Sequence, residues 1–536
     1  MNRETWTRLT NKPVVIFTAL SAIVLTTVLT RVGCQRMSPA DSAPVKLTRS
    51  PLLPQDPLIQ AYFNHSEAAE YLESDRQSTN GRPIQRVGDN LEQVLIDAVA
   101  QAKTKIQIAV QEFRLPRIAQ ALAVAAKNGV KIEIILENKY STPYSAISSS
   151  STEKLNDRER QRYEDNKALM DVNHDGVLSA DEIQTRDALV VLDNAKISRR
   201  DDTSDGSKGS GLMHHKFMII DGKTTIVTSA NWTTSDIHGD ISNPSSLGNA
   251  NSLVKIESFD VANAFAQEFD LMYQGHKFKT RKPDRPVQTF TVGNSKLKLH
   301  FSPIATKKPW TDSSNSLIAD TADQAKTSLD LALFVFSDRQ LSDRLSALPT
   351  RNVTVRGLFE PGFFTRSYSN SWDMLGIPID SPCRQSTGQG TGQGTGQGTG
   401  QDERQPDDLA DRKSSRKRSR KLSRRSSAKP KALTSSKPWT NPAASVGVPK
   451  LKPGDLLHHK FAVIDRTTVI LGSHNWTIAG NTKNDETLMV IENPTIAAHY
   501  QREFDRLSVG ASLGVPSCGV KEPAPTQFVT TDSEDP

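Results

Sequence analysis

The residue types best suited to chemistry occur in two nearly identical stretches, each built around a histidine and a lysine two residues apart. Residues 214–233 and 458–477 agree at 12 of 20 positions. Unrelated segments would share about one or two, so the chain contains an internal repeat. Both copies read His-x-Lys, four residues, Asp, six residues, x-Ser-x-Asn. The candidate residues are His214, Lys216, Asp221, Ser229 and Asn231 in the first copy and His458, Lys460, Asp465, Ser473 and Asn475 in the second.

This combination of side chains suits a phosphate group. On a strand, residues two apart share a face, so His214 and Lys216 point the same way and His215 points to the other side. Lysine supplies positive charge to a non-bridging oxygen, asparagine donates a hydrogen bond, and histidine can attack phosphorus or donate a proton. A metal site is the competing interpretation of clustered histidines. It is disfavoured because the neighbouring lysine would repel a cation, so we expect no catalytic metal.

The elements that must position these residues repeat as well. In the first half, hydrophobic periodicity predicts helices at 91–102 and 118–127 and strands at 105–113 and 130–137. In the second half, the same order predicts helices at 317–326 and 340–347 and strands at 329–336 and 353–359. A strand-helix-strand order implies parallel pairing. The strand after each histidine motif should return as a hairpin, followed by further strands at 251–257 and 486–492 and a helix. The fold class is therefore α/β, in two similar halves.

The duplicated motif resembles that of the phospholipase D superfamily, in which His-x-Lys, four residues, Asp, six residues, Gly-Ser-x-Asn usually occurs twice per chain. The resemblance covers residues 88–275 and 296–508. It implies two α/β domains packed about a pseudo-two-fold axis, with a shared site. By resemblance, the catalytic set comprises His214, Lys216, Asp221, Asn231, His458, Lys460, Asp465 and Asn475, supported by Ser229, Ser473 and Glu486. The copies differ in two places: Thr228 replaces the motif glycine, and Asn251 stands where the second copy has Glu486.

An acidic stretch in the first half has the pattern of a calcium loop. Residues 171–182 match the twelve-residue EF-hand loop, with a glycine at its sixth position for the sharp turn. The alternative is an acidic helix-loop-helix that binds nothing. We expect a structural or regulatory calcium ion on an insertion at 157–190. Its predicted ligands are Asp171, Asn173, Asp175, the Val177 carbonyl, Ser179 and Glu182.

Outside the repeats, the composition indicates one strongly basic segment and no disulfide framework. Residues 412–431 carry eleven Lys and Arg and no acid, so the remainder of a +7 chain sums to −4. This basic tract, inside a low-complexity insertion at 384–450 predicted to be disordered, could attract nucleic acid or anionic lipid. Three cysteines exclude a disulfide framework and leave Cys383 with Cys518 as one possible bridge or two free thiols.

The N-terminus predicts export. Residues 13–30 form an uncharged, largely apolar run preceded by basic residues, which is typical of a signal peptide or a membrane anchor. Residues 1–34 are assigned to this segment, 35–87 and 276–295 to linkers, and 509–536 to a C-terminal tail. We expect a secreted or membrane-anchored protein.

The resemblance implies a phosphodiesterase that hydrolyses phospholipid head groups through a phosphohistidine intermediate, with the membrane surface as its partner. An endonuclease or a phosphatidyltransferase would use the same motifs. From another class, the chain could be a calcium-dependent lipid- or nucleic-acid-binding module without catalysis. The sequence symmetry leaves open which histidine attacks phosphorus.

Overall fold

The computed structural model describes residues 49–515, apart from 78–82, 149–151, 154, 205, 207–210, 306, 379–380 and 382–436. The described residues form one compact unit. Within the described ranges, no helix has the length and apolar character needed to cross a bilayer. The apolar run at 13–30, the basic tract at 412–431 and all three cysteines lie outside these ranges, so the predictions about them stay predictions.

The first half is organised around a seven-stranded sheet of order β1-β9-β8-β7-β4-β5-β6. Its strands β4 and β5 are parallel, as predicted, and β4 pairs antiparallel with β7, the central strand, which carries the first histidine motif. Elsewhere, a hairpin of β2 and β3 forms a separate two-stranded sheet. The strands are β1 Ile59–Phe63, β2 Glu70–Gln77, β3 Pro83–Val87, β4 Lys105–Val110, β5 Lys131–Leu136, β6 Ser198–Asp201, β7 Lys216–Ile220, β8 Thr224–Thr228 and β9 Ser252–Glu257. The helices are α1 Leu91–Gln101, α2 Pro116–Lys127, α4 Asp157–Met170, α5 Ala180–Arg186, α6 Ala188–Asn194, α7 Thr234–Ile237 and α8 Phe259–Tyr273.

The second half repeats this arrangement in a nine-stranded sheet of order β10-β11-β17-β16-β15-β12-β13-β14-β18. Strands β12 and β13 are parallel, and β12 pairs antiparallel with β15, the strand of the second motif. The strands are β10 Gln288–Val292, β11 Ser295–Ser302, β12 Ser328–Leu333, β13 Thr354–Phe359, β14 Ser445–Val448, β15 Lys460–Ile464, β16 Thr468–Gly472, β17 Glu486–Glu492 and β18 Ser512–Leu513. The helices are α9 Ser314–Ala322, α10 Arg339–Leu345, α11 Pro361–Phe364, α12 Ser371–Met374, α15 Ile478–Thr482 and α16 Pro494–Ser508.

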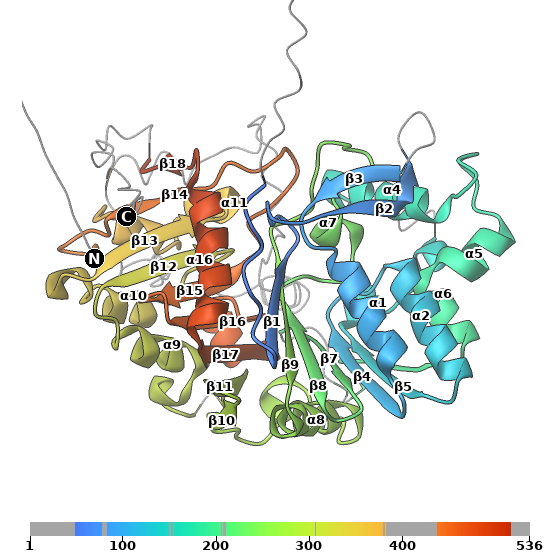
Figure 1. The fold of residues 1–536 in the computed structure, drawn as a ribbon, viewed down its shortest axis with the longest axis horizontal. Helices are drawn as coiled ribbons and strands as arrows, with labels where there is room; N and C mark the ends of the chain where they lie inside the picture. The colour runs from blue at the N-terminus through green and yellow to red at the C-terminus, as the bar shows by residue number, and fades with distance from the viewer. Residues whose placement is uncertain are drawn as a thin grey trace, which may run out of the picture. The chain divides into compact units, whose positions relative to one another are not determined.

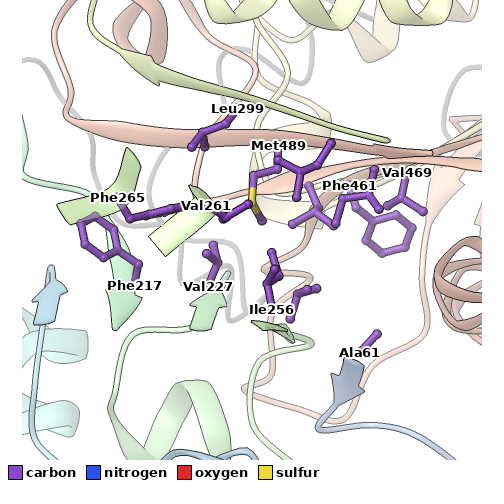
Figure 2. Close-up of a cluster of buried hydrophobic side chains, with 14 of the residues drawn as sticks. Ala61, Phe217, Val227, Ile256, Val261, Phe265, Leu299, Phe461, Val469 and Met489 are labelled. Carbon is purple, nitrogen blue, oxygen red and sulfur yellow. The ribbon is translucent and has the colours of Figure 1, made fainter. Parts of the chain in front are cut away.

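A shared hydrophobic core joins the two halves. Strand residues of both sheets and residues of α8 and α16 belong to one buried cluster. Figure 2 shows side chains from the first half, such as Phe217 and Ile256, gathered with Met489 and Phe461 from the second. The outer faces of the sheets bury separate clusters, one against α1, α2 and α6 and the other against α9 and α10. These strands and helices are labelled in Figure 1. Because the shared core contains side chains of both β7 and β15, it also holds the two histidine motifs in place relative to each other.

Several segments assigned to linkers or tails belong to the folded body. Strand β1, inside the predicted linker 35–87, pairs with β9 and buries Ile59 completely. The predicted linker 276–295 contains the buried Phe278 and strand β10. Within the predicted disordered insertion, Trp439 is buried and β14 pairs with β13; in the predicted tail, β18 pairs with β14. These predictions were wrong at those positions because short edge strands carry little periodicity of their own, and pairing with an existing sheet decides their structure.

Candidate active site

The two motifs meet because the backbone entering each one pairs with the opposite half. The amide of His214 donates to the carbonyl of Asp485 at 3.0 Å, and the amide of Asp485 donates to Leu212 at 2.8 Å. At the related position, the amide of His458 donates to Ala250 at 3.1 Å, and Ala250 donates to Leu456 at 2.8 Å. Each histidine is therefore attached to the strand entry of the other half, which brings the two motifs together.

The first histidine is oriented by a carboxyl group of the second half. His214 Nδ1 lies 2.7 Å from Glu486 Oε2, and both side chains are buried. The hydroxyl of Ser473 donates to the same carboxyl oxygen at 2.8 Å. The predicted supporting residues Ser473 and Glu486 thus act on the histidine of the other copy. With Nδ1 engaged, the Nε2 atom of His214 is the ring nitrogen available for chemistry.

The second histidine is oriented by an amide group of the first half. His458 Nδ1 lies 3.0 Å from Asn251 Oδ1, and the hydroxyl of Ser229 donates to that oxygen at 2.7 Å. Asp236 Oδ2 lies further away, at 4.0 Å from His458 Nδ1. The sequence difference between Asn251 and Glu486 therefore makes the two histidines chemically unequal, since one faces an acid and the other an amide.

The lysines and asparagines complete a symmetric set. Lys216 and Lys460 are buried, and each Nζ donates to the carbonyl of the histidine two residues earlier, at 3.0 and 2.7 Å. Buried side-chain oxygens of Asn231 and Asn475 have no hydrogen-bond partner within the described residues. Buried polar atoms are rarely left unpaired, and the O and N assignment of an amide follows from its hydrogen bonds. The two carboxamides are thus groups that a bound phosphate could engage.

The local electrostatics suit an anion. Burial, together with the positive charges of Lys216 and Lys460, holds the pKa of His214 well below its usual value. Burial and the same two lysines do the same for His458. Burial raises the pKa of Glu486 to about 7. The two lysine ammonium groups beside the imidazoles favour the binding of a phosphodiester anion.

The motif aspartates have a structural place and not a catalytic one. The carboxylate of Asp221 accepts hydrogen bonds from the backbone amides of residues 103–105 at 2.7 to 3.0 Å. Asp465 accepts the equivalent bonds from residues 326–328. Each aspartate lies beyond the far end of the five-residue strand that follows the motif histidine, about 20 Å away at a strand rise of roughly 3.3 Å per residue. This corrects the assignment of Asp221 and Asp465 to the catalytic set, because their role is to anchor the hairpin.

The structure also explains the other residues of the two motifs. His215 and His459 point away from the site and lie 3.3 and 2.8 Å from buried carboxylates of α8 and α16. Thr228, in place of the motif glycine, is accommodated because its hydroxyl donates to the carbonyl of Ala230 at 2.6 Å. Gly472 has no such freedom, since a Cβ there would lie 2.1 Å from the Thr487 carbonyl oxygen.

A pocket of about 330 Å³, its open mouth included, lies beside His458. Sequence reasoning missed most of its lining, which comprises Arg162, Asn231, Thr233, Ser235, Asp236, Asn249, Phe334, Leu456 and His458. It also missed two glutamates that directly follow equivalent strands. Glu137 and Glu360 each accept a hydrogen bond at 2.8 Å from the amide of the residue before a motif histidine. The one signal in the sequence that could have identified these glutamates is their equivalent position directly after β5 and β13.

Hydrogen bonds within the predicted calcium loop hold its backbone in place. The carboxylate of Asp171 accepts the amides of Asp175 and Gly176 at 3.2 and 2.8 Å. Glu182 accepts the Val172 and Ser179 amides, and these bonds, Ser179 first, lower its pKa to about 2. The oxygen-rich donor set fits a hard cation. Among the described residues, no three or more His, Cys, Asp or Glu side chains converge in a ready metal cluster.

Comparison with known proteins identifies the family. A family model described as cardiolipin synthase, PLD-like domain, matches residues 95–273 and 318–508. The mitochondrial cardiolipin hydrolase of Xenopus laevis is 40% identical over 65 residues, 12% of this chain and 31% of that protein. The Chlamydomonas reinhardtii protein of that name is 39% identical over 64 residues, 12% of this chain and 29% of that protein. This chain therefore spans less than a third of the length of these relatives.

Among solved structures, the phosphatidylserine synthase of Haemophilus influenzae aligns with a TM-score of 0.49 at 11% identity, covering 88% of this chain and 90% of that chain. The family model covers more than half of this chain and includes both histidine motifs. The chain therefore belongs to the phospholipase D superfamily, with the PLD-like domain of the cardiolipin synthase type present in two copies.

Proposed function

We propose that the protein is a phosphodiesterase of the phospholipase D type, which hydrolyses phospholipid head groups to phosphatidic acid through a phosphohistidine. The observation that carries this proposal is the crossed pairing, in which His214 lies 2.7 Å from Glu486 and His458 lies 3.0 Å from Asn251. Two oriented imidazoles beside two lysines and two asparagines supply a nucleophile, an acid and an anion cradle.

The inequality of the two histidines supports an assignment of roles. Ionised Glu486 accepts the Nδ1 proton of His214 and stabilises the positive charge that develops when Nε2 attacks phosphorus. A phosphodiester anion bound beside the imidazoles would raise the pKa of His458 and let the ring take up a proton. Neutral Asn251 stabilises that imidazolium less than a carboxylate would, so His458 releases the proton readily to the leaving group. We therefore assign His214 as the nucleophile and His458 as the acid.

The reaction then proceeds in two balanced steps. In the first, His214 Nε2 forms a bond to phosphorus, the bond to the head-group oxygen breaks, and His458 gives that oxygen its proton. In the second, His458 takes a proton from water as the water oxygen attacks phosphorus. The phosphorus–nitrogen bond breaks, which yields phosphatidic acid and restores both histidines. Lys216, Lys460, Asn231 and Asn475 hold the non-bridging oxygens throughout.

The same phosphohistidine supports a second candidate, because an alcohol in place of water would give phosphatidyl transfer. A nuclease would also use this chemistry, whereas a binding module would not. The apolar wall of the pocket, formed by Phe334 and Leu456, favours an amphiphilic substrate over a nucleic acid. The predicted membrane association and export through residues 13–30 would present the protein to such a substrate.

The decisive test is hydrolysis by purified protein of phosphatidylcholine and phosphatidylethanolamine vesicles, with single-stranded DNA as the competing substrate and glycerol as an added alcohol acceptor. We expect head-group release that is abolished in His214→Ala and His458→Ala, with both variants folded. His499→Ala, a histidine near the surface and remote from the motifs, is the matched control. Full activity in either motif variant would remove the paired mechanism, and DNA cleavage alone would favour the nuclease.

We also propose a calcium ion at the loop 171–182, with Asp171, Asn173, Asp175, Val177, Ser179 and Glu182 as oxygen donors. The hydrogen bonds within the loop and the sharp turn at Gly176, with φ of +80°, support this proposal. Calcium would act structurally, by fixing the end of helix α4.

A further inference from the structure

Helix α4, which precedes the acidic loop in the insertion, reaches the active-site pocket. Asp165 on this helix accepts the Ser242 amide at 2.9 Å, and Gln161 bonds to the Ser242 hydroxyl. An asparagine capping box fixes the start of the helix. Between these contacts, Arg162 lines the same pocket as His458 and Asn231. An element that has no counterpart in the repeat thus contributes a cation to the candidate site.

The setting of Arg162 keeps it charged and oriented. Its guanidinium pairs with the buried carboxylate of Glu112, which raises the arginine pKa well above the usual value. It also lies over the ring of Tyr140, 6.0 Å from the centroid. Glu112 is shared, because Arg114 contacts it at 3.4 Å. A guanidinium has five donors, so pairing with one edge of the Glu112 carboxylate does not use up the hydrogen-bonding capacity of Arg162.

The opposite wall of the pocket is apolar. Phe334 packs against His458 with ring centroids 4.9 Å apart, and it forms a small buried cluster with Val335, Phe363 and Leu456. At the equivalent position of the first half, Gln111 accepts a hydrogen bond from Lys216 at 3.1 Å. The second half therefore places an apolar side chain, Phe334, where the first half has the polar Gln111.

The cleaved phosphate does not need Arg162, because the two motif lysines and asparagines already surround it. Asp236, an acid that lines the pocket and whose charge acts on Arg162, accepts hydrogen bonds from the backbone amide of Asn231 at 2.7 Å and from the Asn249 side chain. Glu112 is engaged by the two arginines. A cation beside, but outside, the phosphate cradle is suited to a second anionic group of the same substrate.

We propose that Arg162 determines substrate specificity by binding a phosphate or a carboxylate in the head group of the phospholipid, while the glycerol end lies against Phe334 and Leu456. This inference rests on the proposed function and narrows it to lipids whose head group carries its own anion. A lipid such as phosphatidylcholine, whose head group carries none, would lack this contact.

The test compares Arg162→Gln with Arg160→Gln, an exposed arginine on the same helix. The substrates are short-chain phosphatidylserine for the carboxylate, short-chain cardiolipin for the second phosphate, and short-chain phosphatidylcholine. We expect the ratio of kcat/KM for the anionic head groups to that for phosphatidylcholine to fall about tenfold or more in Arg162→Gln and to stay unchanged in Arg160→Gln. The anionic lipid that shows the larger fall identifies which group Arg162 binds.

A purely structural role would have a different signature. If Arg162 only neutralises Glu112, kcat/KM would fall equally for all three lipids, and Glu112→Gln/Arg162→Gln, which leaves no uncompensated charge, would recover. Either result would overturn the proposal, whereas a ratio that stays low in the double variant supports it. A loss confined to oligonucleotide cleavage would overturn the lipid assignment.

A binding assay distinguishes failure of this inference from failure of the proposed function. In the His214→Ala background, the affinities for the same lipids are measured by calorimetry without turnover. If the wild type hydrolyses no lipid, the proposed function fails. An Arg162-dependent preference for anionic head groups in the binding assay would still support the site, and equal affinities with and without Arg162 would refute it.

Discussion

Replacing Glu486 by glutamine tests the role of the crossed pair most directly. The carboxyl lies 2.7 Å from His214 Nδ1 and is fully buried. A charged hydrogen bond contributes about 1.5–3 kcal/mol and a neutral one about 0.5–1.5 kcal/mol, so the change removes about 1.4 kcal/mol of transition-state stabilisation. We therefore expect kcat/KM at pH 8 to fall about tenfold in Glu486→Gln.

The pH profile should change as well. Below pH 7, Glu486 becomes protonated, because its pKa is about 7. It then donates to Nδ1 of His214 and moves the ring proton to Nε2, which blocks attack. The wild type should lose activity below pH 7, and Glu486→Gln should lack that acidic limb, because an amide oxygen accepts the Nδ1 proton at every pH.

Glu486→Gln should lower activity but raise the free energy of unfolding at alkaline pH. Burial raises the carboxyl pKa from 4.5 to about 7. This group therefore favours the folded state fully below pH 4.5, and the benefit is lost as pH rises through 7. The ionised carboxylate costs about 3 kcal/mol at pH 8, since each unit of pKa shift corresponds to about 1.4 kcal/mol. Glu486→Gln should thus be more stable than the wild type at pH 8 and less active.

The assay is kcat/KM from pH 5 to 9 with a soluble diester, together with urea denaturation at pH 5 and pH 8. Glu492→Gln, at the other end of the same strand, should change neither measurement. The reasoning is refuted if Glu486→Gln keeps wild-type activity with an unchanged acidic limb, or if it is no more stable than the wild type at pH 8.

Three other substitutions give separate expectations. Asn251→Asp would place a carboxylate about where the amide oxygen now lies, 3.0 Å from His458 Nδ1. His458 then becomes a weaker acid, so kcat should fall about tenfold, and the alkaline limb of the kcat profile should shift to higher pH. Gly472→Ala would bring a Cβ to 2.1 Å from the Thr487 carbonyl oxygen, and denaturation should show a loss of about 2–4 kcal/mol. Glu182→Gln should abolish the heat of calcium binding in calorimetry and the loss of thermal stability that EDTA causes in the wild type.

The last two substitutions have a control, and each of the three has a contradicting outcome. Gly514→Ala, where a Cβ meets nothing within 4 Å and φ is +69°, should cost less than Gly472→Ala, where the clash adds to the strain of a φ of +143°. Equal losses would discount the clash. Asp181→Asn alters an exposed acid that is not a predicted ligand, and it should retain calcium binding. Absence of both calcium heat and an EDTA effect in the wild type would end the calcium proposal. An unchanged kcat profile in Asn251→Asp would argue against His458 as the acid.

Much of the scaffold could be read from sequence, because local patterns determine it. The parallel pairing of β4 with β5 and the turn after β7 follow from hydrophobic alternation and from Asp221 and Gly222, which both adopt positive φ. The position of His215 on the face opposite His214 follows from strand geometry alone. The family followed as well, because two copies of one motif at fixed spacing are highly specific.

Only the tertiary structure showed which half serves which histidine. Glu486 lies 272 residues from His214, and Asn251 lies 207 residues from His458. No local pattern encodes such contacts, because they arise from the packing of two sheets across a shared core. The burial of Phe278, the pairing of β10 with β11 and the approach of Arg162 to the pocket have the same origin. Sequence thus determined the chemical groups and their strands, and packing determined which groups act together.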